Sequence, residues 1–229
     1  MFTHVQQENL HPAIPSIITK TKFNKRWYVT PDGTFPSMTT VLGIDKAQGL
    51  LDWQARVGMK EANRIKNEAA ERGTQVHLMC ARYLENEPVD AIIPEFKFNE
   101  VALFKQMRLK LKGCVNNIRL LETPLWSKTY KIAGCVDCVG EYNGILSIID
   151  FKTSTNIKTS DMIDNYFLQA TGYALLYNEM YDECVEQIVI MIATEKGFIP
   201  SIFKRDIGVY VAPLLDKINI FHTKHNYTE

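Results

Sequence analysis

The chain has 229 residues, of which 46% are hydrophobic and 23% are charged, and its 26 Lys and Arg residues balance 26 Asp and Glu residues. This composition is typical of a soluble globular protein, and the zero formal charge argues against a uniformly basic nucleic-acid binder. No apolar run approaches the ~20 residues of a membrane span, and the first residues resemble neither a signal peptide nor an Arg-rich presequence. We therefore expect a protein that is neither secreted nor associated with a membrane.

The five cysteines do not predict a disulfide framework, because their number is odd and their spacing is irregular. Cys135 and Cys138 form a single C-x-x-C pair. Without a second pair, this spacing favours free cysteines in a strand over a zinc or redox site.

The first half of the chain predicts short strands followed by helices. Residues 26–37 read as two strands around a Pro-Asp-Gly turn, residues 49–85 as helix with breaks at Gly58 and Gly73, and residues 97–116 as a basic amphipathic helix. A hydroxyl side chain after the second strand is expected to cap a short helix, with three candidates: Ser37, Thr39 and Thr40.

The second half predicts a sheet with intervening helices. Three strands are expected at about 119–128, 132–142 and 145–152, then a helix at 161–181 capped by Ser160 or Asp161. A nearly continuous apolar run at 184–194 predicts a strand buried on both faces, and a further strand and a last helix follow at 197–206 and 210–224. The fold class is therefore α/β, a central mixed sheet flanked by helices.

A basic stretch interrupts the otherwise neutral chain. Seven Lys and Arg residues lie between residues 101 and 131, against the single acidic residue Glu122. Lys105, Arg108 and Lys112 fall on the predicted helix and can follow the phosphates of a polyanion. A solvated helix face explains the same pattern equally well.

The chemically most informative stretch is a predicted hairpin around Asn143–Gly144. Asn-Gly between alternating apolar runs is typical of a two-residue type I′ turn. In that register Asp137 lies directly opposite Asp150 on one face, with the Cβ atoms ~4.5–5.5 Å apart. Lys152 shares this face, because side chains alternate along a strand. A different loop length would turn one aspartate to the other face.

Two like charges directly opposite each other destabilise a hairpin unless something compensates them. One aspartate can be protonated, Lys152 can bridge the pair, or a divalent cation can bind between them. The first two arrangements are purely structural, and only the third gives the site a chemical function.

The set Asp137, Asp150 and Lys152, with Glu122 on the preceding predicted strand, resembles the metal site of the PD-(D/E)xK nuclease superfamily. Gln169 and Tyr173 lie four residues apart in the next helix, which is similar to the Q-x-x-x-Y signature of the RecB-type branch.

The resemblance extends upstream to Gly73 and His77, which match a G-x-x-x-H of RecB-type nucleases. From its surroundings alone, a lone histidine among Ala69, Cys80 and Ala81 is more often a core residue. The resemblance instead implies that His77 reaches the metal, and Gly73 would let its helix approach the sheet closely.

Within this superfamily the chain resembles the mitochondrial genome maintenance exonucleases and their phage-encoded relatives over residues 35–205. The matching segments are FPSMTTVLG, LLDWQARVG, RGTQVH, LETPLW, AGCVDCVGEYNGILSIIDFKTS and LQATGYALLYNEMY. This implies one nuclease domain, 1–229, with N-terminal strands and helices at 1–116 and the catalytic sheet at 117–229. The missing targeting segment favours the cytoplasm of a bacterium or of a phage-infected host.

The resemblance also implies roles for the site residues. Mg²⁺ or Mn²⁺ would be bound by His77, Asp137, Asp150 and the carbonyl of Phe151. Lys152 would orient or deprotonate the attacking water, and Glu122 would act near the metal. Gln169 would fix Lys152 or the water, while Tyr173 would contact the substrate backbone or support the site.

The implied activity is exonucleolytic cleavage of DNA, preferentially from single-stranded ends. Weaker DNA-contact candidates are Ser37, Thr39 and Arg72. A RecB- or Cas4-like nuclease module of a larger recombination complex is a competing reading, although no cysteine after Cys184 is available for a Cas4-type iron–sulfur cluster. A catalytically inactive DNA-binding protein and a structural α/β protein are also compatible with the sequence.

Overall fold

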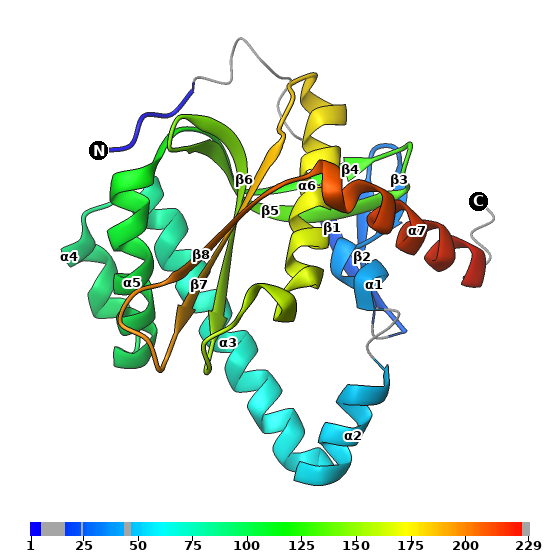
Figure 1. The fold of residues 1–229 in the computed structure, drawn as a ribbon, viewed down its shortest axis with the longest axis horizontal. Coiled ribbons are helices and arrows are strands. Elements are labelled where there is room, and N and C mark those ends of the chain that lie inside the picture. Colours follow the sequence, from blue (N-terminus) through cyan, green and yellow to red (C-terminus); the bar gives the residue numbers. More distant parts are fainter. Residues whose placement is uncertain (6–16, 24, 44–46, 226–229) are drawn as a thin grey trace.

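The computed structural model describes residues 1–5, 17–23, 25–43 and 47–225. In this part of the chain a five-stranded sheet, ordered β4-β5-β6-β7-β8, lies beside a small three-stranded sheet, β1-β2-β3 (Figure 1). The strands are β1 (Ile18–Lys22), β2 (Lys25–Thr30), β3 (Gly33–Pro36), β4 (Val115–Ser127), β5 (Ile132–Tyr142), β6 (Ile145–Ser154), β7 (Gln187–Thr194) and β8 (Ser201–Asp206).

The large sheet is mixed, as predicted. Strands β4, β5 and β6 are antiparallel neighbours, β6 and β7 run parallel, and β7 and β8 are again antiparallel. A parallel pair needs a crossover, and helix α6 provides it between β6 and β7. The helices are α1 (Met38–Leu42), α2 (Ala47–Val57), α3 (Met59–Leu84), α4 (Val89–Ile92), α5 (Phe98–Cys114), α6 (Asp164–Tyr181) and α7 (Gly208–Lys224), with short 3₁₀ turns at Ile93–Glu95 and Ser160–Met162.

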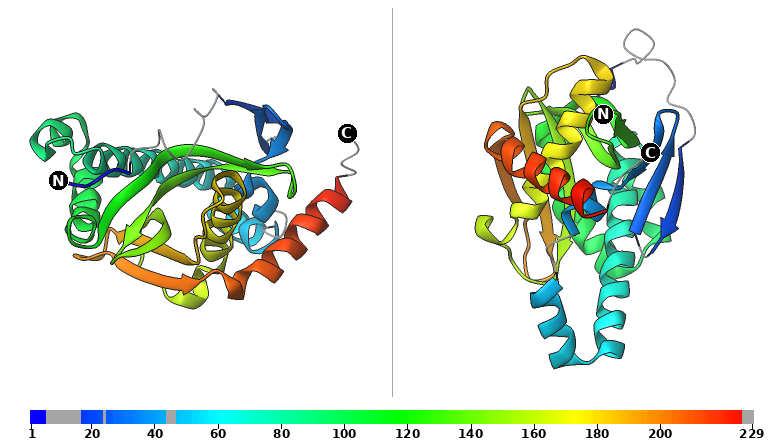
Figure 2. Two further views of the ribbon diagram at one scale, coloured as in Figure 1. Left: turned by 90° about the horizontal axis from the view of Figure 1, so that it is seen from above. Right: turned by 90° about the vertical axis from the view of Figure 1, so that its right-hand side faces the viewer.

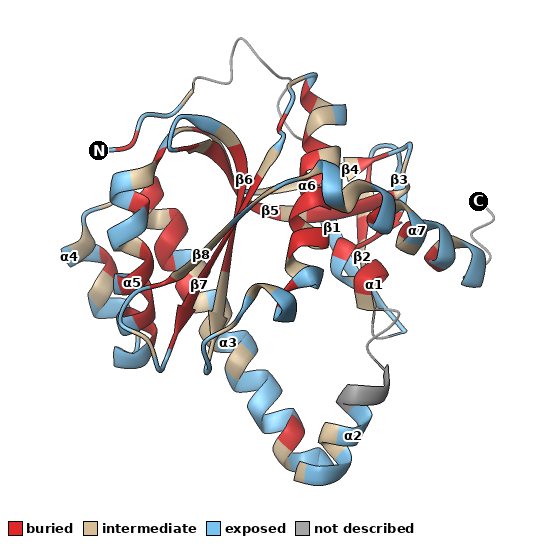
Figure 3. Ribbon diagram, in the orientation of Figure 1, coloured by how far each residue is buried: buried red, intermediate tan, exposed pale blue. Residues whose placement is uncertain are grey.

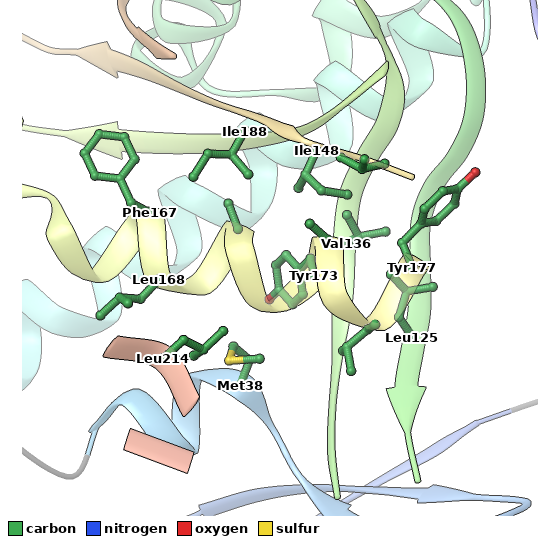
Figure 4. Packing of buried hydrophobic residues seen from close by; sticks show 14 of the residues in the cluster. Met38, Leu125, Val136, Ile148, Phe167, Leu168, Tyr173, Tyr177, Ile188 and Leu214 are labelled. Carbon is green, nitrogen blue, oxygen red and sulfur yellow. The ribbon is translucent and has the colours of Figure 1, made fainter. Parts of the chain in front are cut away.

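Helices cover both faces of the large sheet (Figures 1 and 2). One core lies between the sheet and helices α3 and α5, and it includes Phe104, Met107 and Phe151. The other lies between the sheet and helices α1, α6 and α7. Figure 4 shows this second core around α6, with Val136 and Ile148 of the sheet on one side of the helix. Strand β7 contributes to both cores, so its predicted burial on two faces is confirmed.

Helix α2 and the first half of α3 project from the body as a helical arm (Figure 2), and most of this arm is exposed (Figure 3). The predicted break at Gly58 is confirmed, since its φ of 85° separates α2 from α3. The predicted break at Gly73 is wrong, because this residue lies inside α3, which is a single helix of 26 residues. An interior glycine costs a helix only ~1 kcal/mol, which packing of the following turns against α5 and β6 outweighs.

Two other local predictions differ in outcome. Ser37 caps α1, accepting a hydrogen bond from the Thr40 N–H at 3.1 Å, as expected. Neither Ser160 nor Asp161 caps α6, which begins at Asp164 after a 3₁₀ turn. The Ser160 hydroxyl instead accepts a hydrogen bond from Arg205 at 2.6 Å. Within the described residues, every helix is too short or too polar for a bilayer crossing.

Candidate functional site

The β5–β6 hairpin has the predicted register. Its residue pairs run from the turn to Cys138–Ile149, and the two residue numbers in every pair add up to the same total, as a two-residue loop requires. The backbone φ angles at Asn143–Gly144 are 53° and 79°, as a type I′ turn requires. Asp137 and Asp150 are therefore the next positions after the last pair of the ladder.

The strands separate at these two aspartates. The Asp137 carboxylate accepts a hydrogen bond from the Phe151 N–H at 2.7 Å. In a regular ladder, a backbone carbonyl would accept the hydrogen bond at this position. Val136 and Val139 pack into the same core although they are three residues apart, so side-chain alternation breaks between them. This irregularity corrects the expectation that both carboxylates share one face. Asp137 turns toward α3, whereas Asp150 pairs with Lys152.

Strand β4 is irregular at the same level. Glu122 has a φ of 44°, a left-handed conformation that is rare for a residue with a side chain. In the β4–β5 ladder, the residue pairs directly before and after Glu122 and Asp137 are present. The Thr123 hydroxyl donates a hydrogen bond to the Leu121 carbonyl at 2.8 Å. Such strain typically costs ~1–3 kcal/mol and is concentrated at functional sites.

Helix α3 brings His77 to this point of the sheet. Its Nδ1 atom lies 3.4 Å from Asp137 Oδ1 and 3.9 Å from Glu122 Oε1. Its ring packs edge-on against Phe151, with the centroids 6.0 Å apart. Ligand atoms of His77, Glu122 and Asp137 all lie within 4.8 Å of one another. We name these three residues the acidic triad.

The second aspartate has a different partner. Asp150 is fully buried, and its Oδ2 atom lies 2.5 Å from Lys152 Nζ. Its Oδ1 atom has no hydrogen-bond donor among the described residues. Burial raises the pKa of Asp150 to about 6, although Lys152 opposes this shift. The lysine thus compensates one carboxylate of the hairpin, and the acidic triad holds the other.

The three groups of the triad shift one another's pKa values. Removal from water, and next the Asp137 charge, raise the pKa of Glu122 to about 7. Burial alone would raise the pKa of Asp137 and lower that of His77. The attraction between these two groups opposes burial and, together with the Lys152 charge and the Phe151 N–H at Asp137 and with the Asp150 charge at His77, it reverses both shifts. Crowded carboxylates with an imidazole and an unsatisfied buried oxygen nearby fit a divalent cation, with oxygen donors suited to Mg²⁺ and the imidazole also to Mn²⁺.

The triad lies in a cleft of about 600 Å³. The cleft wall also contains Lys152, Gln169 and Tyr173, so the structure brings the predicted catalytic residues to one place. The Gln169 side-chain amide donates to the Tyr173 hydroxyl at 2.8 Å rather than to Lys152. The Tyr173 ring covers Gly134, where an added Cβ would lie 2.5 Å from the ring.

The predicted DNA contacts fall in different places. Ser37 and Thr39 line the cleft, with Ser37 buried as the cap of α1. Outside it, Arg72 forms an ion pair with Glu195 at 2.6 Å. None of the three predicted DNA contacts on α5 lines the cleft: Lys105 and Lys112 are exposed elsewhere, and Arg108 lies over the ring of Tyr83.

Arg26 and Tyr28 are among the cleft residues that sequence reasoning missed, and the role it gave to Gly73 was wrong. Arg26 and Tyr28 line the cleft from β2, and no motif or periodicity connects this strand with the hairpin. Gly73 does line the cleft, but a Cβ there would lie 3.7 Å from Thr153 Oγ1, an ordinary contact distance. Close approach of α3 to the sheet therefore does not require this glycine.

Comparison with known proteins gives a partial match to an exonuclease. The chain is 34% identical to human mitochondrial genome maintenance exonuclease 1 over 88 residues, covering 36% of this chain and 25% of that protein. The mouse protein of the same name is 32% identical with the same coverage. The chain thus spans about a quarter of the length of these curated relatives. This similarity supports a relationship to a nuclease.

The remaining comparisons add no further assignment. No protein-family model matches the chain. Among solved structures, the crystal structure of SSO0001 aligns over 81% of this chain and 75% of its own, with 14% sequence identity and a TM-score of 0.37. That likeness is too loose to support a conclusion about fold or function.

Proposed function

We propose that residues 1–229 form a single PD-(D/E)xK-type nuclease domain of the RecB-like branch, a metal-dependent DNA exonuclease. The observation that carries this proposal is the acidic triad beside the Asp150–Lys152 pair at the base of one cleft. The partial similarity to a mitochondrial exonuclease supports the same activity. Clustered carboxylates that hold a divalent cation beside a lysine are suited to a reaction on a phosphate group.

The residues that would hold Mg²⁺ or Mn²⁺ are His77, Asp137 and Asp150, with Glu122 as an additional ligand. The Phe151 carbonyl remains part of the predicted ligand set. When bound, such a cation supplies Lewis-acid stabilisation of a phosphate and lowers the pKa of bound water. The donors present fit it, because an imidazole and two carboxylates lie within 4.8 Å of one another and the neighbouring Asp150 carboxylate has a buried oxygen that lacks a donor.

The other side chains prepare the substrate and the water. The Asp150 and Asp137 carboxylates raise the pKa of Lys152 despite its burial, so it stays protonated and offsets charge on the phosphoryl group. In this state Lys152 orients the attacking water rather than deprotonating it. Tyr173, held by Gln169 at 2.8 Å, forms a rigid wall against which the DNA backbone is positioned.

The substrate is DNA, and we propose single-stranded ends as the preferred form. Support for cleavage at DNA ends comes from the exonuclease activity named for the partial relatives. The cleft of about 600 Å³ lies in the size range of sites that enclose one small ligand, so it suits part of one strand better than a duplex. The exposed Thr39 hydroxyl on the cleft wall is available to its phosphates or sugars, whereas the predicted contact Ser37 is buried as the cap of α1 and would act by positioning Thr39.

The decisive experiment compares labelled DNA substrates. Linear single strands labelled at the 5′ or 3′ end, a circular single strand and a linear duplex are each incubated with the full chain in Mg²⁺, Mn²⁺ or EDTA. We expect metal-dependent loss of the linear single strands and survival of the circle. The order in which label is released gives the polarity. Degradation of the circle would contradict exonucleolytic action, and activity in EDTA would contradict metal dependence.

A further inference from the structure

Arg26 brings a positive charge into the cleft from the small N-terminal sheet. It lines the cleft together with Tyr28, which lies two residues later on the same face of β2. The small sheet packs against the large one through Tyr28 and Phe35, which form a buried cluster with Ala133 of β5. A strand distant in sequence from the hairpin thus contributes to the wall of the cleft.

The backbone of Arg26 is fixed to the first turn of α1. Its carbonyl accepts hydrogen bonds from the Ser37 N–H at 2.9 Å and from the Thr40 hydroxyl at 3.2 Å. Its N–H donates to the same Thr40 hydroxyl at 3.2 Å. Ser37 is itself held as the helix cap, and its hydroxyl lies 3.0 Å from that of Thr39. The Arg26 side chain therefore starts from a well-defined position beside Thr39.

The charge of Arg26 is not neutralised by a carboxylate, unlike other cations around the site. Lys152 is paired with Asp150, and Arg72 with Glu195. Arg26 belongs to none of the ion pairs found among the residues that the structure describes. Its guanidinium instead interacts with the Tyr28 hydroxyl and lies near Cys135.

Arg26, Cys135 and Glu122 line the same cleft. The Cys135 thiol lies 3.9 Å from Glu122 Oε2 and near the Arg26 guanidinium. The cation and the triad thus face one cleft from different elements of the fold. One extended ligand in this cleft can place one anionic group at the triad and the next at Arg26.

We propose that Arg26, with the Thr39 hydroxyl beside it, binds a backbone phosphate of the DNA strand adjacent to the phosphate at the acidic triad. This inference rests on the proposed nuclease function and adds a second phosphate position to it. The planar guanidinium matches a phosphate with two parallel hydrogen bonds, and its charge excludes a second metal ion from this position. Arg26 thereby fixes which linkage of the strand lies at the triad.

The first test measures how DNA binding depends on salt. Binding of a fluorescein-labelled single strand to the full chain is followed by anisotropy in EDTA from 50 to 300 mM salt. Each phosphate contact on a single strand contributes ~0.7 to the slope of log affinity against log salt. We expect Arg26→Gln to lower the slope by about 0.7 and to weaken binding roughly fivefold at 0.1 M salt. Arg26→Lys should retain most of the slope.

A matched control removes one charge elsewhere. Lys204 is exposed on β8, the far edge strand of the large sheet, and Lys204→Gln changes the net charge by the same amount. We expect this variant to bind with the wild-type slope. An equal loss in both variants, or an unchanged slope in Arg26→Gln, would overturn the phosphate position. Circular dichroism confirms that each variant is folded.

The second test locates the phosphate. Neutral methylphosphonate linkages are placed one at a time along the strand, and affinity is measured with wild type and Arg26→Gln. We expect one position at which the neutral linkage weakens wild-type binding roughly fivefold and leaves Arg26→Gln unaffected. Equal losses in both proteins at every position would overturn the assignment. Because these measurements need no cleavage, they test the phosphate position independently of the proposed activity. The proposed activity itself is overturned if the wild-type protein leaves DNA intact in Mg²⁺ and Mn²⁺.

Discussion

The two ends of the β5–β6 hairpin each carry a hollow of similar size, about 600 Å³ at the acidic triad and about 640 Å³ at the turn. At the turn end the polar groups are satisfied within the protein. The Asn86 side chain bonds both the N–H and the carbonyl of Phe2, and Asn116 accepts the N–H of Thr3. These asparagines complete the backbone hydrogen bonds of the N-terminal segment.

The other end differs in charge and not in volume. Asp150 keeps a buried oxygen without a donor, and Glu122 and Asp137 lie together beside His77. A protein that needed only a stable hairpin would replace such groups with apolar ones, because burying imperfectly compensated carboxylates is costly. The comparison shows that unsatisfied charge, rather than the size of a hollow, identifies the functional end.

The largest difference between the two ends is expected in catalysis. Asp137→Asn keeps an acceptor for the Phe151 N–H but removes the charge of the triad. We expect DNA cleavage to fall by at least ~10²-fold, within the ~10²–10⁴ typical of losing a positioned catalytic group. Initial rates on a linear single strand in Mg²⁺ measure this effect.

The matched control lies in the hollow at the turn. Glu141→Gln removes one carboxylate from that wall, and we expect cleavage within about twofold of wild type. Equal losses in the two variants would mean that the functional end has been misassigned. Retained cleavage in Asp137→Asn would remove the triad from the mechanism.

Metal binding should distinguish the two ends without any substrate. A cation that binds the folded protein at a hundred times its Kd stabilises it by ~2.7 kcal/mol. For a chain of this length that corresponds to a rise in Tm of about 2–4 °C for each kcal/mol. We expect Mn²⁺ to raise the Tm of wild type and of Glu141→Gln, but not that of Asp137→Asn. Identical shifts in all three proteins would place the cation elsewhere.

The local part of the site could be predicted from the sequence. Asn143–Gly144 specifies its own turn, and the turn specifies the register that places Asp137 and Asp150 at adjacent positions. Alternating apolar residues then give the strands, because burial enforces the alternation. These relations act over fewer than twenty residues, so no knowledge of the tertiary fold is needed.

The remaining part depends on contacts between distant segments. The left-handed backbone at Glu122 exists only because intact ladder pairs on both sides hold it, and no residue preference predicts it. The same irregularity turns Asp137 away from the face that simple alternation assigns. Arg26 reaches the cleft through the packing of Tyr28 against β5, and the exposed residues of strand β1 carry no apolar pattern that predicts a strand.

We expect the packing around the acidic triad to tolerate added side-chain volume poorly, although the cleft itself is open. A Cβ at Gly134 would lie 2.5 Å from the ring of Tyr173, which is 4% exposed and cannot move into solvent without leaving its core. We expect Gly134→Ala to destabilise the protein by ~1–3 kcal/mol, as overpacking usually does. Urea unfolding measures the change. Unaltered stability would show that the ring is free to shift.

We expect the residues at the turn end of the hairpin to affect the stability of the protein but not its cleavage activity. Asn86 has a φ of 69° and makes two hydrogen bonds to Phe2, so Asn86→Gly removes the bonds while tolerating the backbone conformation. We expect a loss of about 1–2 kcal/mol, since each net hydrogen bond contributes ~0.5–1.5 kcal/mol. Cleavage per folded molecule should remain at the wild-type rate. A specific loss of activity would give this hollow a functional role.

The smallest expected effect separates two explanations for Gly73. If the glycine served close packing of α3 on the sheet, Gly73→Ala would destabilise the protein. The 3.7 Å between an added Cβ and Thr153 Oγ1 leaves room for the methyl group, and alanine favours a helix interior by up to ~1 kcal/mol. We therefore expect Tm to rise by about 2–4 °C. A fall in Tm would restore the packing explanation. A rise combined with weaker DNA binding would mean that the glycine keeps the cleft open for the strand, since this residue lines the same cleft as Arg26.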